Sequence, residues 1–243
     1  MNRTLVFELM NKDLQEIRKN GYVLYSLMFL PLVLTIIGIA ATVGYTFTTG
    51  PNGPPGDNIS TIFSSLFVLV PAIITTLIGS TSVIIEKNNR SLEPLLATPI
   101  TDTELFAGKA LAPLVPGVLI SLFTYGIYMA ATDALTFGKL GYLLYPTPLN
   151  IVQMFFLIPV IGMLGTFASL IVSSKTRDIR TAQQLSSLVV LPVLILVYIP
   201  LFAAGVDLII NLALGVLLLI VELALFTICV KAFNRENILV NWE

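Results

Sequence analysis

Glu222 is the one acidic or basic side chain deep within an apolar run of this sequence, the run from 208 to 230. A charged side chain at the centre of a bilayer costs roughly 3 kcal/mol on insertion scales, so such a residue needs a chemical or structural reason. One hypothesis is a carboxyl that contacts substrate or handles a proton or an ion along its path. The other is a neutral, hydrogen-bonded acid that holds helices together. The sequence leaves both hypotheses open.

A second set of polar groups lies in the stretch from Glu86 to Lys109, between two long apolar runs. It reads EKNNRSLEPLLATPITDTELFAGK, in a chain in which only 11% of the residues are charged. An average soluble domain has about 25% charged residues. A compact polar loop between membrane spans can couple the membrane part of a protein to a soluble one, so this stretch is a candidate partner-binding segment.

Composition argues against several other chemistries. The chain has no histidine, and it shows no paired intramembrane aspartates or metal-ligand cluster. A Ser–His pair and a metal site are therefore not expected, and the chain is not expected to be an enzyme or to hold a cofactor of its own. Cys229 is the single cysteine, and we expect it to pack as a small apolar side chain.

Membrane spans are the elements that must position these groups, because 56% of the 243 residues are hydrophobic. A helix needs about 20 apolar residues to cross the hydrocarbon core. We predict an all-α integral membrane fold, a single domain over 1–243, without a cleavable signal peptide. Its six spans are expected at about 22–46, 60–85, 109–132, 149–173, 184–204 and 208–231. The segment 140–148, with Tyr142 and Tyr145, is expected to lie at the membrane interface.

The distribution of lysine and arginine predicts the orientation of these spans. If the N-terminus is cytoplasmic, the outer segments hold only Lys139. The inner segments then hold Arg3, Lys12, Arg18, Lys19, Lys87, Arg90, Lys109, Lys175, Arg177, Arg180, Lys231 and Arg235. The bias predicts a multi-pass protein of the plasma membrane with both termini in the cytoplasm.

Residues 1–20 are expected to form an amphipathic helix on the cytoplasmic membrane surface. Its apolar stripe is predicted to consist of Phe7, Met10, Leu14 and Ile17. The charged residues away from that stripe are Glu8, Lys12, Asp13, Glu16 and Lys19.

Small residues at helical spacing predict where two spans pack closely, as they do in lipid. The second span offers Ala72, Thr76 and Ser80, and the fourth offers Gly165, Ser169 and Ser173. We interpret both stripes as helix–helix contacts, and a substrate path is the alternative.

Capping signals divide the Glu86–Lys109 stretch into two helical starts. Ser91 is a suitable N-cap, and Pro99 ends that short helix near Thr98. Thr101 and Glu104 fit a capping box that opens the helix leading into the third span. The short helix displays Leu92, Leu95 and Leu96. These leucines need burial against the membrane surface, the N-terminal helix or a soluble partner.

At these residues the chain resembles the ABC-2 type permease family, the membrane subunits of a class of ATP-driven exporters. The resemblance rests on Glu86-Lys87, on the segment from Ser91 to Pro99 and on Gly108-Lys109. The six-span layout and the N-terminal helix extend it over nearly the whole chain. Asn88 stands where a second acid is frequent, and Arg90 where a glycine is common, so the polar contacts of this elbow are not carried over.

The resemblance implies that Ser91–Thr98 is a coupling helix, within a loop over 86–108, that docks into a nucleotide-binding subunit. The implied coupling residues are Glu86, Arg90, Ser91, Leu92, Glu93, Leu95, Leu96 and Thr98. The family also implies two permease subunits, as a homodimer or with a similar chain, and a substrate path between them. The chain has no P-loop sequence, so ATP and Mg are expected on a separate ATPase.

The second cytoplasmic loop, 174–184, holds Lys175, Arg177 and Arg180. It is interpreted as a second contact with the ATPase or with lipid headgroups, or as the positive-inside signal alone. The leading hypothesis is thus the permease subunit of an ABC exporter, with no nucleic-acid partner. The alternative is a stand-alone secondary transporter that uses Glu222 as a proton- or ion-linked site. The lack of a second intramembrane charge and of an internal repeat disfavours that alternative.

Overall fold

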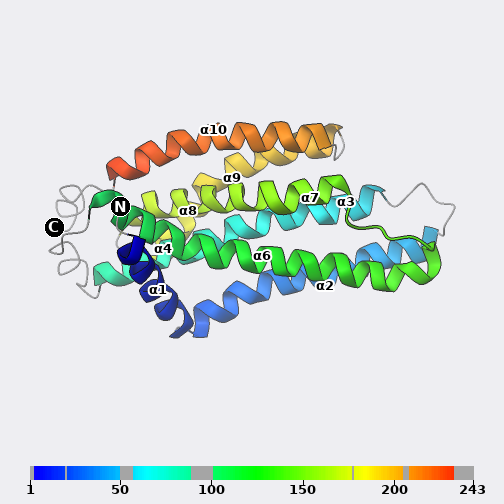
Figure 1. Ribbon diagram of the computed structural model, residues 1–243, viewed down its shortest axis with the longest axis horizontal. Coiled ribbons are helices and arrows are strands. Elements are labelled where there is room, and N and C mark those ends of the chain that lie inside the picture. Colours follow the sequence, from blue (N-terminus) through cyan, green and yellow to red (C-terminus); the bar gives the residue numbers. More distant parts are fainter. Residues whose placement is uncertain are drawn as a thin grey trace.

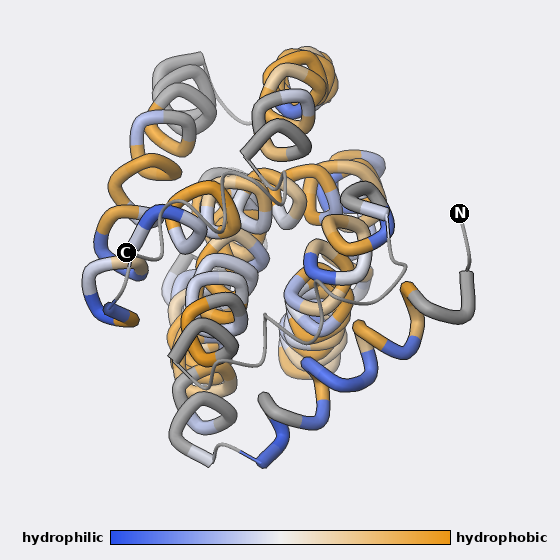
Figure 2. The backbone as a smooth tube through the Cα atoms, turned by 90° about the vertical axis from the view of Figure 1, so that its left-hand side faces the viewer, coloured by the Kyte–Doolittle hydropathy of each residue, from blue (hydrophilic) through white to orange (hydrophobic). Residues whose placement is uncertain are grey.

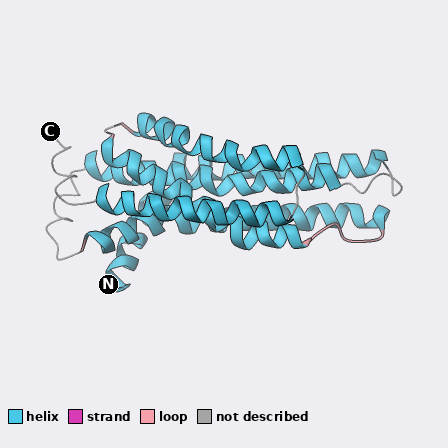
Figure 3. Cartoon of the chain, turned by 90° about the horizontal axis from the view of Figure 1, so that it is seen from above, coloured by secondary structure: helices cyan, strands magenta, loops and turns pink. Residues whose placement is uncertain are grey.

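The computed structural model describes residues 3–19, 21–49, 57–88, 101–176, 178–204 and 208–232. Helices make up nearly all of these residues, and the described ranges contain no strand (Figure 3). The all-α prediction is confirmed. The elements are α1 (Arg3–Lys19), α2 (Gly21–Thr49), α3 (Asp57–Leu66), the 3₁₀ turn η1 (Phe67–Leu69), α4 (Val70–Asn88), α6 (Asp102–Leu140), α7 (Pro148–Val152), the π-helical turn η2 (Gln153–Leu157), α8 (Ile158–Lys175), α9 (Ile179–Ala204) and α10 (Leu208–Ala232).

Long helices run side by side along one axis (Figure 1). Within the described ranges, five stretches are long and apolar enough to cross a membrane: Leu27–Thr48, Ile59–Ser82, Glu104–Leu140, Pro148–Lys175 and Leu208–Thr227. They coincide with five of the predicted spans. The other predicted span falls on α9, which is helical but is not among the five, so the sixth span stays a prediction.

Helix α6 is longer than the predicted span over 109–132. Its 39 residues correspond to about 58 Å of helix at 1.5 Å per residue. The predicted capping box begins it: the Glu104 N–H donates to Thr101 Oγ1 at 3.4 Å, and the Thr101 N–H donates to Glu104 Oε2 at 3.1 Å. Gly141 ends it in the left-handed region, with φ of 75°.

Two of the spans are interrupted by a change of helix type. The second consists of α3, η1 and α4, and the fourth consists of α7, η2 and α8. The turns η1 and η2 contact each other inside the bundle. Both breaks therefore lie at the same level of the molecule. A 3₁₀ stretch inside a helix often marks a functional hinge, and π turns are frequent at functional sites.

The predicted stripes of small residues meet where α4 packs on α8, the most extensive helix pair in the described part of the chain. Thr76 Oγ1 lies 3.5 Å from the carbonyl oxygen of Gly165. A Cβ added at Gly165 would lie 2.4 Å from Thr75 Oγ1 and 2.7 Å from the backbone oxygen of Ala72. A Cβ added at Gly79 would likewise come too close to the side chain of Ser169. The helix–helix interpretation of the stripes is confirmed.

Helix α1 crosses the end of the bundle at which α10 also ends (Figure 1). Seen along the bundle axis, hydrophilic and hydrophobic residues alternate along α1, as an amphipathic helix requires (Figure 2). The predicted contact of the apolar stripe with the membrane surface stays a prediction. Phe7 is 59% exposed and Asp13 is buried, because the inward face consists of Val6, Leu9, Met10 and Asp13.

Within the predicted interfacial segment 140–148, the two tyrosines lie in different surroundings. Tyr142 is exposed, but Tyr145 is only 5% exposed and lies inside the bundle. Asp133 fixes the loop, because its Oδ1 accepts the backbone N–H groups of Leu144 at 2.8 Å and Tyr145 at 3.2 Å. The loop thus turns back beside α6 and inserts one aromatic side chain between the helices.

Candidate coupling site

A buried ion pair joins three helices at the α1 end of the bundle. Lys109 Nζ on α6 donates to both carboxylate oxygens of Asp13 on α1, at 3.0 and 2.9 Å. Ser82 Oγ on α4 donates to Asp13 Oδ2 at 2.8 Å. The side chains of Lys109 and Asp13 are 1% and 2% exposed. We call these three residues the Asp13 clasp.

The sequence around the clasp allows the close approach that the ion pair needs. Val6, Leu9, Met10 and Asp13 follow the i, i+3, i+4, i+7 spacing of one helix face. Gly108 lies under this face, and a Cβ there would lie 2.9 Å from the Cβ of Leu9. The lack of a side chain at 108 therefore lets α1 rest on α6 directly beside Lys109.

Two residues of the clasp lie on the helices before and after the segment that is predicted to couple to a partner. Ser82 lies on α4, which ends at Asn88, and Lys109 lies on α6, which begins at Asp102. Of the predicted coupling residues, Glu86 lies on the last turns of α4. The others, which are Arg90, Ser91, Leu92, Glu93, Leu95, Leu96 and Thr98, lie outside the described residues.

The predicted second contact is a short connection between α8 and α9. Lys175 ends α8 and Arg180 lies in the first turn of α9, and both are exposed, while Arg177 lies outside the described residues. Asp178 caps α9, because its Oδ2 accepts the Thr181 N–H at 3.1 Å and the Thr181 hydroxyl at 3.0 Å. These hydrogen bonds lower the pKa of the exposed Asp178 carboxyl. Lys175 and Arg180 therefore place two exposed positive charges close to this cap.

Comparison with known proteins identifies the class to which this arrangement belongs. A sequence model described as ABC-2 family transporter protein matches residues 7–228. The chain belongs to the ABC-2 transporter family. The match begins inside α1 and ends inside α10, so it contains the clasp, the predicted coupling segment and all five candidate spans. No curated protein matches the chain.

Family membership makes the chain a multi-pass membrane component of a transporter, not itself catalytic. Within this permease, Glu222 lies on α10 and is 4% exposed. Its Oε1 has no hydrogen-bond partner among the described residues. Leu218, one turn earlier, belongs to the same buried cluster as Leu164 of α8. The carboxyl therefore lies between helices of one permease chain.

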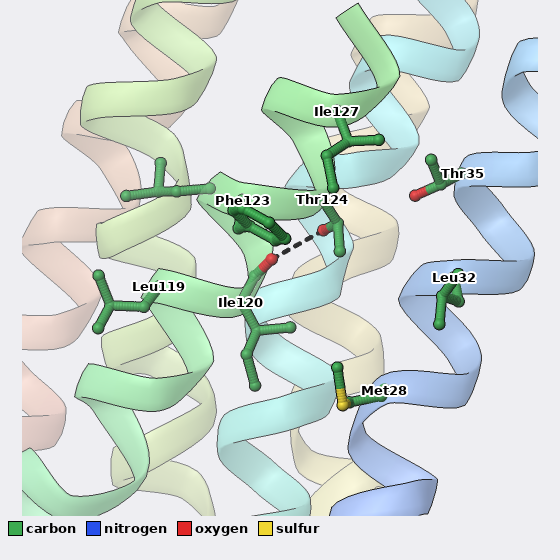
Figure 4. A pocket seen from close by; sticks show the side chains of 9 residues that line it. Met28, Leu32, Thr35, Leu119, Ile120, Phe123, Thr124 and Ile127 are labelled. Atoms are coloured by element: carbon green, nitrogen blue, oxygen red, sulfur yellow. Dashed lines mark hydrogen bonds between the residues drawn. The ribbon is translucent and has the colours of Figure 1, made fainter. Parts of the chain in front are cut away.

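An apolar groove of about 700 Å³ opens between α2 and α6 of the permease (Figure 4). Met28, Leu32 and Thr35 form one wall, and Leu119, Ile120, Leu122, Phe123, Thr124 and Ile127 form the other. The hydroxyl of Thr124 donates to the Ile120 carbonyl at 2.9 Å, and that of Thr35 to the Pro31 carbonyl at 2.7 Å. The groove suits hydrocarbon and offers no charge. Glu222 is not part of its lining.

The Asp13 clasp was missed by sequence reasoning, although Lys109 was noted as part of the family pattern. Asp13 was grouped with the charged residues that lie away from the apolar stripe of the N-terminal helix. The signal that would have found it is the alternative phase of the same helix, in which Asp13 falls in line with Val6, Leu9 and Met10. An acid on an otherwise apolar face requires a buried partner.

Proposed function

We propose that this permease is the membrane subunit of an ATP-driven exporter, in which a separate nucleotide-binding subunit hydrolyses ATP and drives substrate movement. Besides family membership, the Asp13 clasp is the observation that supports the proposal. It ties the helices on both sides of the 89–100 segment, α4 and α6, to the N-terminal helix. A push on that segment would therefore move α1, α4 and α6 together.

The proposal has specific partners. The coupling helix over Ser91–Thr98 docks into the ATPase, and Lys175, Arg177 and Arg180 form the second contact. ATP and Mg belong to the ATPase chain. A second copy of this or a similar permease completes the substrate path, α9 supplies the sixth span, and both termini lie in the cytoplasm of the cell that carries it in its plasma membrane. Supporting this orientation, α1 and the end of α10 lie at the same end of the bundle (Figure 1).

Substitutions in the coupling helix test the proposal. Leu95→Asp and Glu93→Lys are each expected to lower permease-stimulated ATP hydrolysis by more than tenfold. The first places a new charge in the docking cleft and the second reverses one, and each change is expected to cost about 1.4 kcal/mol or more. The measurement is hydrolysis by the ATPase that co-purifies with the permease, in reconstituted membranes. Membrane insertion is expected to be unchanged.

Leu143→Asp is the matched control, since Leu143 is exposed in the loop at the opposite end of the bundle. It is expected to leave stimulated hydrolysis at the parental level. Parental hydrolysis in both coupling-helix variants, or failure of any ATPase to co-purify, would disprove the proposal.

Glu222→Gln separates this proposal from the stand-alone carrier, for which the buried, unpartnered Glu222 Oε1 is the favourable observation. The substitution keeps the size of the side chain and removes its ionisation. We expect stimulated ATP hydrolysis within about twofold of the parent, because the ATP-driven mechanism needs no proton at this site. A carrier would instead transport along an ion gradient without any ATPase, and Glu222→Gln would abolish that transport.

A further inference from the structure

A cluster of hydroxyl groups holds the bundle together at the end opposite α1. Tyr145 OH lies 2.8 Å from Tyr128 OH and donates to the Ser60 carbonyl at 3.1 Å. Tyr128 OH also lies 2.9 Å from Thr42 Oγ1. These four residues come from the 141–147 loop, α6, α3 and α2. One group of hydrogen bonds therefore joins three helices and the loop that leads into α7.

A second layer of polar contacts lies beside the first. Tyr125 OH of α6 donates to Gln153 Oε1 at 2.9 Å and accepts the Asn150 Nδ2–H at 2.8 Å. Gln153 Nε2 lies 3.4 Å from Asn211 Oδ1 of α10. All four side chains are buried. We call the Tyr125, Tyr128 and Tyr145 side chains, with these partners, the tyrosine cluster.

The tyrosine cluster lies against both helix breaks. The Phe67 ring of η1 stacks on Tyr125 and Tyr128, with ring centroids 5.3 and 4.8 Å apart. Gln153 is the first residue of η2. The short helix α3 ends at η1, and the short helix α7 ends at η2. Each of the two helices also contributes a residue to the tyrosine cluster. Ser60 lies on α3, and Asn150 lies on α7.

We propose that α3 and α7 form a gate that closes this end of the permease, with η1 and η2 as its hinges and the tyrosine cluster as its latch. When the latch hydrogen bonds break, α3 and α7 swing away from α6 while α4 and α8 stay packed on each other. The use of this gate in transport rests on the proposed function. The latch itself is a property of the resting chain and is testable without the ATPase.

Cysteine labelling of the purified permease in nanodiscs tests the latch. The parent for all variants carries Cys229→Ser, which removes the single cysteine. Ser64→Cys places a thiol on α3 at a fully buried position, near Tyr125. Adding Tyr145→Phe removes the hydroxyl and keeps the ring, and we expect the rate of maleimide labelling at 64 to rise about fivefold or more. Thr42→Val is a second, independent latch variant with the same expectation.

Ser169→Cys is the matched control, because Ser169 is equally buried but lies on α8, on the other side of η2. Its labelling rate is expected to be the same with and without Tyr145→Phe. An unchanged rate at 64 in both latch variants would disprove the gate. An equal rise at 64 and 169 would also disprove it, since it would show general loosening and not a hinged movement. Neither outcome depends on an ATPase.

Discussion

Asp13→Ala is expected to lower the free energy of unfolding by about 3–5 kcal/mol, the range found when one partner of a buried ion pair is removed. The reason is that Lys109, which is 1% exposed, would lose the carboxylate that now accepts two hydrogen bonds from its Nζ. Ser82 would also lose its acceptor. Thermal or denaturant unfolding of the purified permease in detergent would measure the change.

Glu8→Ala is the control on the same helix, because Glu8 is exposed, and it is expected to change stability by less than about 0.5 kcal/mol. The double variant Asp13→Leu with Lys109→Met is expected to recover most of the loss, since apolar replacement of both partners leaves neither charge of the pair buried. If Asp13→Ala were no more harmful than Glu8→Ala, the clasp would not hold α1 to the bundle.

Gly165→Ala is expected to destabilise the permease by about 2–3 kcal/mol, at the upper end of the range for overpacking a core. The added Cβ would lie 2.7 Å from the Ala72 carbonyl oxygen and 3.0 Å from the Ala72 Cα. These are backbone atoms that cannot rotate away, so α4 and α8 would have to separate along their shared face. The same unfolding measurement would report the loss.

Gly126→Ala is the matched glycine control, since a Cβ there meets no atom within 4 Å. Alanine is the better helix former by about 1 kcal/mol, so this variant is expected to be neutral or slightly more stable. Equal effects at 165 and 126 would mean that the close approach of α4 and α8 is not what requires glycine.

The sequence predicted the features of this fold that depend on local signals. Hydrophobic runs located the helices, Thr101 with Glu104 located the start of α6, and the stripe at Gly165 located the α4–α8 contact. Each of these signals is contained within a few turns of one helix. The coupling segment was predicted from the same kind of local pattern, and it stays a prediction.

The features that were missed depend on partners far apart in the chain. Asp13 was grouped only with the charged residues away from the apolar stripe, because its partner, Lys109, is 96 residues away, and an amphipathic pattern carries no information about such a partner. The inward position of Tyr145 depends on hydroxyl and carbonyl groups from α2, α3 and α6. The amides of Asn150, Gln153 and Asn211 in apolar runs were the available hint, since a polar group in lipid needs a hydrogen-bond partner.

The length of α6 has a mechanical consequence. Lys109 of the clasp and Tyr128 of the latch lie on this one continuous helix, about 29 Å apart along its axis. A tilt of about 5° about the clasp would displace the Tyr128 end by about 2.5 Å over that length. Such a displacement is nearly as large as the 2.8 Å separation of the two tyrosine hydroxyls. The helix would thus act as a lever, turning a small rotation at one membrane surface into the loss of a hydrogen bond at the other.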